Sequence, residues 1–201
     1  LVFSSSVMQP AYGYLSDRVH TRLFTVLGPA VAGVFISSLG LAPSFVWLLL
    51  LVFIGGSGSA AYHPPASARV LLGIEEGRGR AMAFFVSAGT LGTALGPAYF
   101  STVSGWLGFS GTWWAALPGV LVAALLFRVL PPPATPAHGK GRFDWKPLAA
   151  VWRPLSLLYM LVFLRSIIQI VFAQFLPLYL HLVRGRPILE SNYIMSAYLA
   201  A

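Results

Sequence analysis

The feature that most constrains the fold is a series of long apolar runs without charge. No charged residue lies between Leu23 and Leu41 or between Phe45 and Ala68, and residues 81–127 are also uncharged. A helix needs roughly 20 residues to cross the hydrocarbon of a bilayer, and each run is long enough. A backbone in lipid must satisfy its own hydrogen bonds. The sequence therefore predicts an all-α, polytopic membrane protein.

The remaining apolar segments complete the expected set of spans. The third run is too long for one helix, and the turn-prone segment Ser104–Gly111 divides it, which gives four spans. A fifth runs from about Pro154 to Val183, and Ser191–Ala201 begins another. At the other end, Leu1–Leu15 is apolar but shorter than a span. We therefore expect the chain to begin and to end inside a helix.

Most basic residues lie in alternate connections, and only Arg184 and Arg186 lie in the last connection. Only 9% of the chain is charged, yet its calculated pI is near 10.3. The connections at 42–44 and 104–111 contain no basic residue. Because short cytoplasmic loops are enriched in Lys and Arg, we expect a multi-pass protein of a bacterial inner membrane with no nucleic-acid partner. The basic residues of the first, third and fifth connections are Arg18, Arg22, Arg69, Arg78, Arg80, Arg128, Lys140, Arg142, Lys146 and Arg153.

The longest hydrophilic stretch, Pro131–Arg153, begins with three prolines and predicts a cytoplasmic linker. Within it, Phe143 and Trp145 flank Asp144, which suits either a short segment at the membrane interface or a solvated linker. The linker divides the chain into an N-terminal bundle (1–130), the linker itself (131–153) and the start of a C-terminal bundle (154–201).

The first connection resembles the signature loop between the second and third helices of the major facilitator superfamily. The residues that fit are Gly13, Leu15, Asp17, Arg18 and Arg22, whereas His20 and Thr21 replace a usual glycine and a usual basic residue. In that family the loop helps to keep the cytoplasmic side closed. The alternative is that Asp17 only caps a helix and Arg18 only orients it.

A second segment is similar to the glycine-rich motif of the fifth helix in proton-coupled drug exporters. Glycines four residues apart leave a helix face without bulk, where another helix can approach, and a proline adds a kink. Tyr99 and Phe100 replace glycines that often follow. Small faces occur in many membrane bundles. The motif residues are Gly89, Gly92, Gly96 and Pro97.

The segment Gly55–Arg69, taken with Gly79, Arg80 and the Gly-Pro helix, resembles the fosmidomycin resistance branch of the same superfamily. The resemblance implies twelve helices in two six-helix bundles that work by alternating access, and a monomer. This chain would then run from the second helix to the start of the eighth.

His63 is a titratable group at an unusual depth. If its helix spans Phe45 to Arg69, the imidazole lies roughly 9 Å to the cytoplasmic side of the helix centre. It could carry a proton or bind an anionic substrate. Alternatively, it bonds to a carbonyl that Pro64 and Pro65 leave free.

Arg165 is the only formal charge deep inside a predicted span. Burying an unpaired cation there costs at least about 2.5 kcal/mol, so Arg165 must face protein or water. Together with Gln169 and Gln174 it predicts a polar stripe suited to an anionic compound. The alternative is a structural ion pair with a carboxylate elsewhere.

Three functions follow from these patterns. We expect a transporter that exports small toxic compounds such as fosmidomycin by proton antiport, and so confers antibiotic resistance by efflux. An importer or exchanger of small organic anions or sugars is an alternative on the same fold. A non-transporting membrane sensor is another. No cofactor, metal site or enzymatic activity is expected, because the sequence shows no cluster of His, Asp, Glu or Cys.

Overall fold

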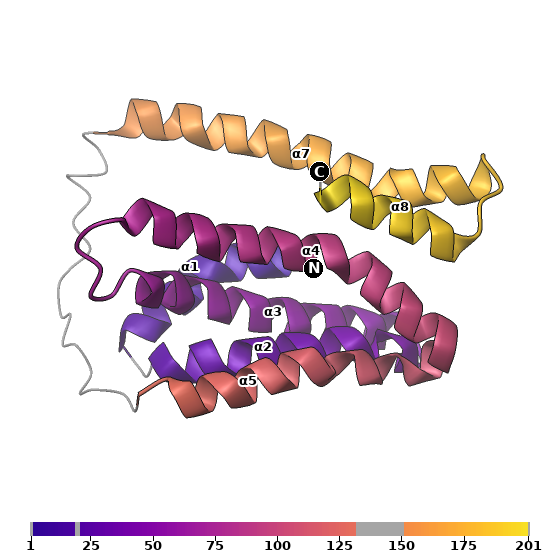
Figure 1. The fold of residues 1–201 in the computed structure, drawn as a ribbon, viewed down its shortest axis with the longest axis horizontal. Helices are drawn as coiled ribbons and strands as arrows, with labels where there is room; N and C mark the ends of the chain where they lie inside the picture. The colour runs from indigo at the N-terminus through magenta and orange to yellow at the C-terminus, as the bar shows by residue number, and fades with distance from the viewer. Residues whose placement is uncertain (1, 19–20, 132–150, 201) are drawn as a thin grey trace. The chain divides into compact units, whose positions relative to one another are not determined.

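The computed structural model describes residues 2–18, 21–131 and 151–200, which form helices joined by short connections and contain no strand. The elements in chain order are α1 (Val2–Arg18), α2 (Thr21–Ser37), the 3₁₀-helix η1 (Ser38–Leu41), α3 (Phe45–Val70), α4 (Arg78–Leu107), the 3₁₀-helix η2 (Phe109–Ala116), α5 (Leu117–Val129), α7 (Trp152–Leu182) and α8 (Ile188–Ala200). Figure 1 shows their course along the chain.

Five helical segments of the described chain are long and apolar enough to cross a membrane. They are Arg22–Leu41, Phe45–Val70, Arg78–Leu107, Phe109–Val129 and Trp152–Leu182. These ranges agree with the charge-free runs of the sequence, since a run without charges is what hydrocarbon tolerates. The prediction of an all-α protein with membrane-spanning helices is confirmed.

The boundary between the third and fourth spans is sharper than expected. The sequence predicts a turn over Ser104–Gly111, but α4 continues to Leu107 and the chain turns at Gly108, with φ of 71°. The hydroxyl of Ser104 donates to the carbonyl oxygen of Ser101 at 3.0 Å, so this polar residue is satisfied within the helix. Only glycine adopts the Gly108 conformation at low cost.

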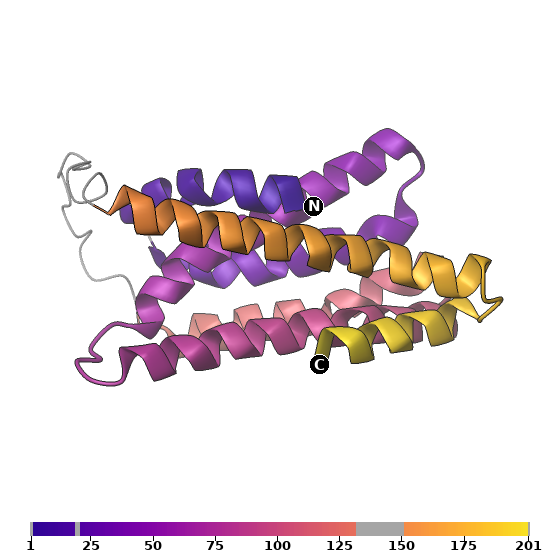
Figure 2. The same cartoon turned by 90° about the horizontal axis from the view of Figure 1, so that it is seen from above.

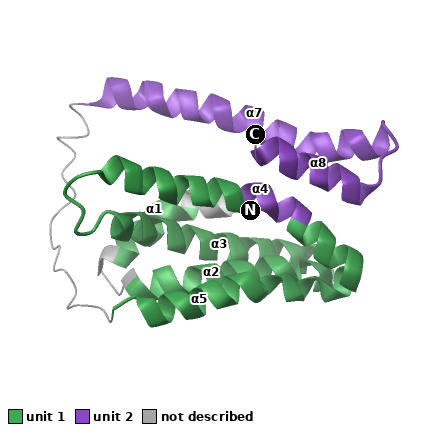
Figure 3. Ribbon diagram, in the orientation of Figure 1, with its two compact units in different colours: residues 1–92, 99–138 green, residues 93–98, 139–201 purple. Residues whose placement is uncertain are grey.

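The described chain separates into two compact units, which are coloured in Figure 3. The first comprises residues 1–92 and 99–138, and the second comprises residues 93–98 and 139–201. Most of the predicted linker, including Phe143, Asp144 and Trp145, lies outside the described residues.

In the first unit, α2 packs against α3 on one side and α5 on another, and α1 packs against α3. These helices run side by side (Figure 1, Figure 2). Glycines allow the closest approaches, as small residues commonly do in membrane bundles. A Cβ atom placed on Gly28 of α2 would lie 2.7 Å from Cβ of Tyr62, and one on Gly33 would lie 3.2 Å from Cα of Gly119. A side chain at Gly28 would overlap its neighbours, and one at Gly33 would require the facing backbone to shift by a few tenths of an ångström.

The basic residues of the first unit lie at one end of it. The α1–α2 connection, the α3–α4 connection and the C-terminal end of α5 occupy one end of the unit (Figure 1). This placement agrees with the positive-inside orientation expected from the sequence. The basic residues described at that end are Arg22, Arg69, Arg78, Arg80 and Arg128.

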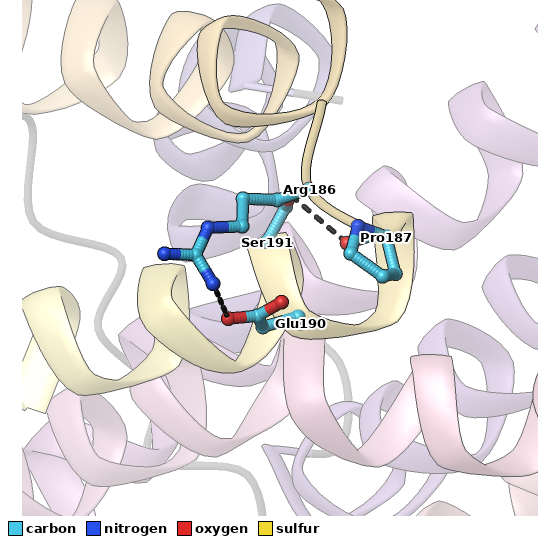
Figure 4. Close-up of polar contacts among 4 residues, drawn as sticks. All are labelled: Arg186, Pro187, Glu190 and Ser191. Atoms are coloured by element: carbon cyan, nitrogen blue, oxygen red, sulfur yellow. Dashed lines mark hydrogen bonds and ion pairs between the residues drawn. The ribbon is translucent and has the colours of Figure 1, made fainter. Parts of the chain in front are cut away.

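In the second unit, α7 and α8 form a helical hairpin whose rings stack at Phe172 and Tyr198, with centroids 5.7 Å apart. The turn between them is held by polar contacts, shown in Figure 4. Arg186 forms an ion pair with Glu190 at 2.9 Å, and the Ser191 hydroxyl donates to the carbonyl oxygen of Pro187 at 3.1 Å. Helix α8 therefore begins at Ile188, three residues before the expected start.

Candidate functional site

The signature loop joins α1 to α2. Gly13 faces α3, because a Cβ atom placed on it would lie 3.6 Å from Cβ of Pro64. Asp17 and Arg18 are the last residues of α1, and their side chains lie outside the described part of the molecule. The predicted gate role of these two residues therefore stays a prediction.

Arg22, the last residue of the signature, makes a contact that the sequence did not predict. Its Nη2 donates to the carbonyl oxygen of Phe127, 105 residues away, and its Cζ lies 4.7 Å from the centroid of the Phe127 ring. The last carbonyls of a helix lack intrahelical partners and form the negative end of the helix dipole. Arg22 therefore caps α5 and ties it to the start of α2.

His63 lies on α3, about 10 Å along the helix from its end at Val70. The imidazole is exposed and its ring centroid is 5.6 Å from that of Tyr62. It makes no hydrogen bond with the described residues. Helix α3 continues through Pro64 and Pro65, and it is the Ser67 hydroxyl that donates to the carbonyl oxygen of Pro64, at 2.9 Å. The alternative in which His63 bonds to a free carbonyl is not observed here.

The glycine motif lies on α4. A Cβ atom on Gly89, Gly92 or Gly96 would meet no described atom within 4 Å. Close helix packing at these glycines therefore stays a prediction, whereas close contacts are observed at other glycines, among them Gly28, Gly33, Gly55, Gly58 and Gly119.

Pro97 lies inside α4, which continues past it. A proline disturbs the backbone hydrogen bonds around it, and nearby hydroxyl groups can replace them. In the second unit, the backbone N–H of Ala98 donates to Oγ of Ser196 on α8 at 2.9 Å. The role of Ser196 could not be predicted from the sequence, since nothing in its local sequence indicates a partner 98 residues away.

The polar residues of α7 do not form a single stripe. Arg165 and Gln169 are four residues apart and share one face of the helix. Gln174 comes nine residues after Arg165, which places it about half a turn around the axis, on the opposite side. The expected stripe is therefore corrected to Arg165 and Gln169. All three side chains are exposed in the second unit, and Arg165 makes no hydrogen bond or ion pair with the described residues.

The described residues contain no group of three or more His, Asp or Glu side chains that could hold a metal ion. The chemistry that the described site residues offer is reversible protonation at His63 and a fixed positive charge at Arg165. Both lie within segments apolar enough to cross a membrane.

The sequence profile of the Major Facilitator Superfamily matches residues 1–201, the whole chain. The chain belongs to this superfamily. It is 28% identical over 211 residues to the fosmidomycin resistance protein of Escherichia coli (strain K12), an alignment that covers 98% of this chain and 50% of that protein. It is 31% identical over 125 residues to the uncharacterized MFS-type transporter YfnC of Bacillus subtilis (strain 168), covering 62% of this chain and 31% of that protein.

The chain thus spans about half the length, or less, of these curated relatives. No solved structure matches it significantly. The predicted family is confirmed, and a transporter family with membrane-spanning helices accounts for the apolar, exposed helix surfaces.

Proposed function

We propose that this chain is part of a monomeric transporter of the bacterial inner membrane that exports small toxic compounds, such as fosmidomycin, in exchange for protons. The observation that carries the proposal is Arg165, a cation near the middle of the 31-residue apolar helix α7. A charge at that depth is costly unless it faces protein or water, and such residues mark substrate or ion pathways. Similarity to a fosmidomycin resistance protein over 98% of the chain supports an anionic substrate.

In the mechanism that we propose, one group of residues binds the substrate and another carries the proton. Arg165 and the neighbouring Gln169 amide bind the anionic part of the substrate, because a guanidinium matches phosphonate and carboxylate oxygens. His63 takes up a proton from one side of the membrane and releases it to the other. Alternating access of two helical bundles then moves the substrate and the proton across the membrane, without covalent chemistry or a cofactor.

The test is proton movement in everted membrane vesicles that contain the complete protein and have an acid interior. Fosmidomycin is added first, and cationic dyes follow. We expect fosmidomycin to dissipate the pH gradient only in vesicles that contain the protein, since each exported molecule returns a proton. Vesicles without the protein are the control. A gradient that no compound changes would contradict proton-coupled export.

A second candidate is an importer or exchanger of small organic anions, because Arg165 suits an anion whatever the direction of transport. The sign of the proton flux separates the two. Substrate that enters together with protons, or exchange of labelled anions with no proton flux, favours this second function.

A further inference from the structure

Helix α4 has a weak point at Pro97. Proline has no backbone N–H, so one of the hydrogen bonds that stabilise the helix is absent there, and glycines in a helix interior weaken it further. Gly92 and Gly96 precede Pro97, and α4 continues beyond it to Leu107. The bend of α4 at this point therefore depends on the segment that packs against it, and not only on α4 itself.

In the second unit, α8 contacts α4 immediately after this weak point. The backbone N–H of Ala98 donates to Oγ of Ser196 at 2.9 Å. Both sides of the contact are buried. Ala94, one turn before Ala98 on the same face of α4, is 1% exposed, and on α8 Met195 and Ser196 are 2% and 9% exposed. A hydrogen bond shielded from water in this way is stronger than an exposed one, so the Ser196 hydroxyl holds the segment that follows Pro97.

The contact lies in the half of the two helices that is expected to face away from the cytoplasm. Helix α4 starts among the basic residues, and Ala98 is about 14 Å from its opposite end at Leu107. Ser196 is about 12 Å from the start of α8 at Ile188. In the orientation expected from the basic residues, both of these ends are on the outer side of the membrane. The hydrogen bond therefore joins α4 and α8 in their outer halves.

We propose that the hydrogen bond from Ala98 to Ser196 is a latch that keeps the outer side of the transport pathway closed and breaks each time the protein opens outward. This inference rests on the proposed function, in which α4 belongs to the first bundle, α8 belongs to the second, and the bundles move against each other. One neutral hydrogen bond is weak enough to break in every cycle. When it breaks, the segment after Pro97 is released and α4 bends at its weak point.

The first test measures how often the outer side opens. Ala94→Cys places a small thiol on the buried face of α4 beside the latch, in a version of the complete protein with no other cysteine. A charged, membrane-impermeant thiol reagent is added to right-side-out vesicles, and mass spectrometry follows the labelling rate. We expect Ser196→Ala to raise this rate about two- to tenfold, the effect of one neutral hydrogen bond. Ser196→Thr keeps the hydroxyl and should label at the rate of Ala94→Cys alone.

Ser191→Ala is the matched control for this test. Ser191 is also buried on α8, but its hydroxyl donates within the same turn, to the carbonyl oxygen of Pro187 at 3.1 Å (Figure 4). Its removal should leave the labelling rate of the Ala94→Cys thiol unchanged. Equal labelling rates for Ser196→Ala and Ser191→Ala would overturn the latch. Because the labelling needs no substrate, this result is distinct from a failure of the proposed transport.

The second test replaces the hydrogen bond with a covalent one. The backbone nitrogen of Ala98 is 2.9 Å from Oγ of Ser196, so the two Cα atoms lie within about 7 Å, the limit for a disulfide. We expect the double variant Ala98→Cys, Ser196→Cys to lose uptake of labelled substrate when oxidised and to regain it on reduction. An oxidised protein that transports at the reduced rate would identify a fixed packing contact and overturn the proposal. If the wild type moves no tested compound, the proposed function fails, and the labelling rates alone decide whether the latch exists.

Discussion

Arg22 binds the backbone of Phe127 through a hydrogen bond and its ring through a cation–π contact, so one side chain joins the beginning of α2 to the end of α5. Both contacts are within the first unit. Arg22 also belongs to the signature loop that, in this superfamily, is expected to hold the cytoplasmic side closed. The loop is thereby anchored to the last helix before the predicted linker.

Arg22→Ala should destabilise the first unit. It removes a charged hydrogen bond to a helix end and a cation–π contact, together worth about 1–3 kcal/mol. Thermal unfolding of the complete protein in detergent measures the effect. Arg128→Ala removes a charge from the same end of the bundle, at an exposed position of α5, and should have little effect. Equal melting temperatures for the two variants would contradict the capping role of Arg22.

Gly58→Val should destabilise the contact between α2 and α3. The new Cβ would lie within 2.7–2.9 Å of Ala32 N, Gly28 O and Val31 Cβ, and two of these atoms belong to backbone that cannot rotate away. Overpacking of this kind costs about 1–3 kcal/mol. Gly105→Val in α4 makes the same change where no described atom lies within 4 Å of the new Cβ. Fluorescence size-exclusion chromatography should show aggregation only for Gly58→Val, and a monodisperse Gly58→Val protein would contradict the expectation.

The spans could be predicted from sequence because exclusion of charge is a local property of the chain. The run from Phe45 to Ala68, for example, corresponds to α3 within two residues. Contacts between helices could not be predicted in the same way. Glycine spacing identified Gly92 and Gly96 as a small face, but spacing does not identify the helix that approaches a face, and the observed close approaches include those at Gly28 and Gly58.

For the site residues, too, local properties could be predicted from the sequence and contacts with distant residues could not. The depth of Arg165 and His63 follows from counting residues along a helix, so the sequence alone gives it. The direction of a side chain around the helix axis also follows from counting. Each residue turns the helix by about 100°, so the nine residues from Arg165 to Gln174 place the two side chains on opposite sides. The partners of Arg22 and Ser196 lie 105 and 98 residues away, and only the folded structure identifies them.

Arg165→Gln should lower transport of an anionic substrate at least about tenfold, because the loss of one charge-assisted hydrogen bond weakens binding by about 1.5–3 kcal/mol. Arg165→Lys keeps the charge but not the planar fork and should retain partial activity. Uptake of labelled substrate into everted vesicles gives the rates. Arg184→Gln, in the connection between α7 and α8, removes an exposed charge and is the control. Wild-type transport by Arg165→Gln would exclude it from the site, and loss of the protein from the membrane would favour the structural ion pair.

His63→Gln should separate substrate movement from proton movement. Glutamine keeps a hydrogen-bonding side chain at this depth of α3 but does not titrate, so export driven by a pH gradient should fall, while exchange of labelled for unlabelled substrate continues without a gradient. His181→Gln is the matched control, because His181 lies in the last turn of α7 with its Nδ1 2.8 Å from the carbonyl oxygen of Arg186. It should leave both rates unchanged. If His63→Gln still exports against a pH gradient at the wild-type rate, another group carries the proton, and His63 has at most a substrate-binding or structural role.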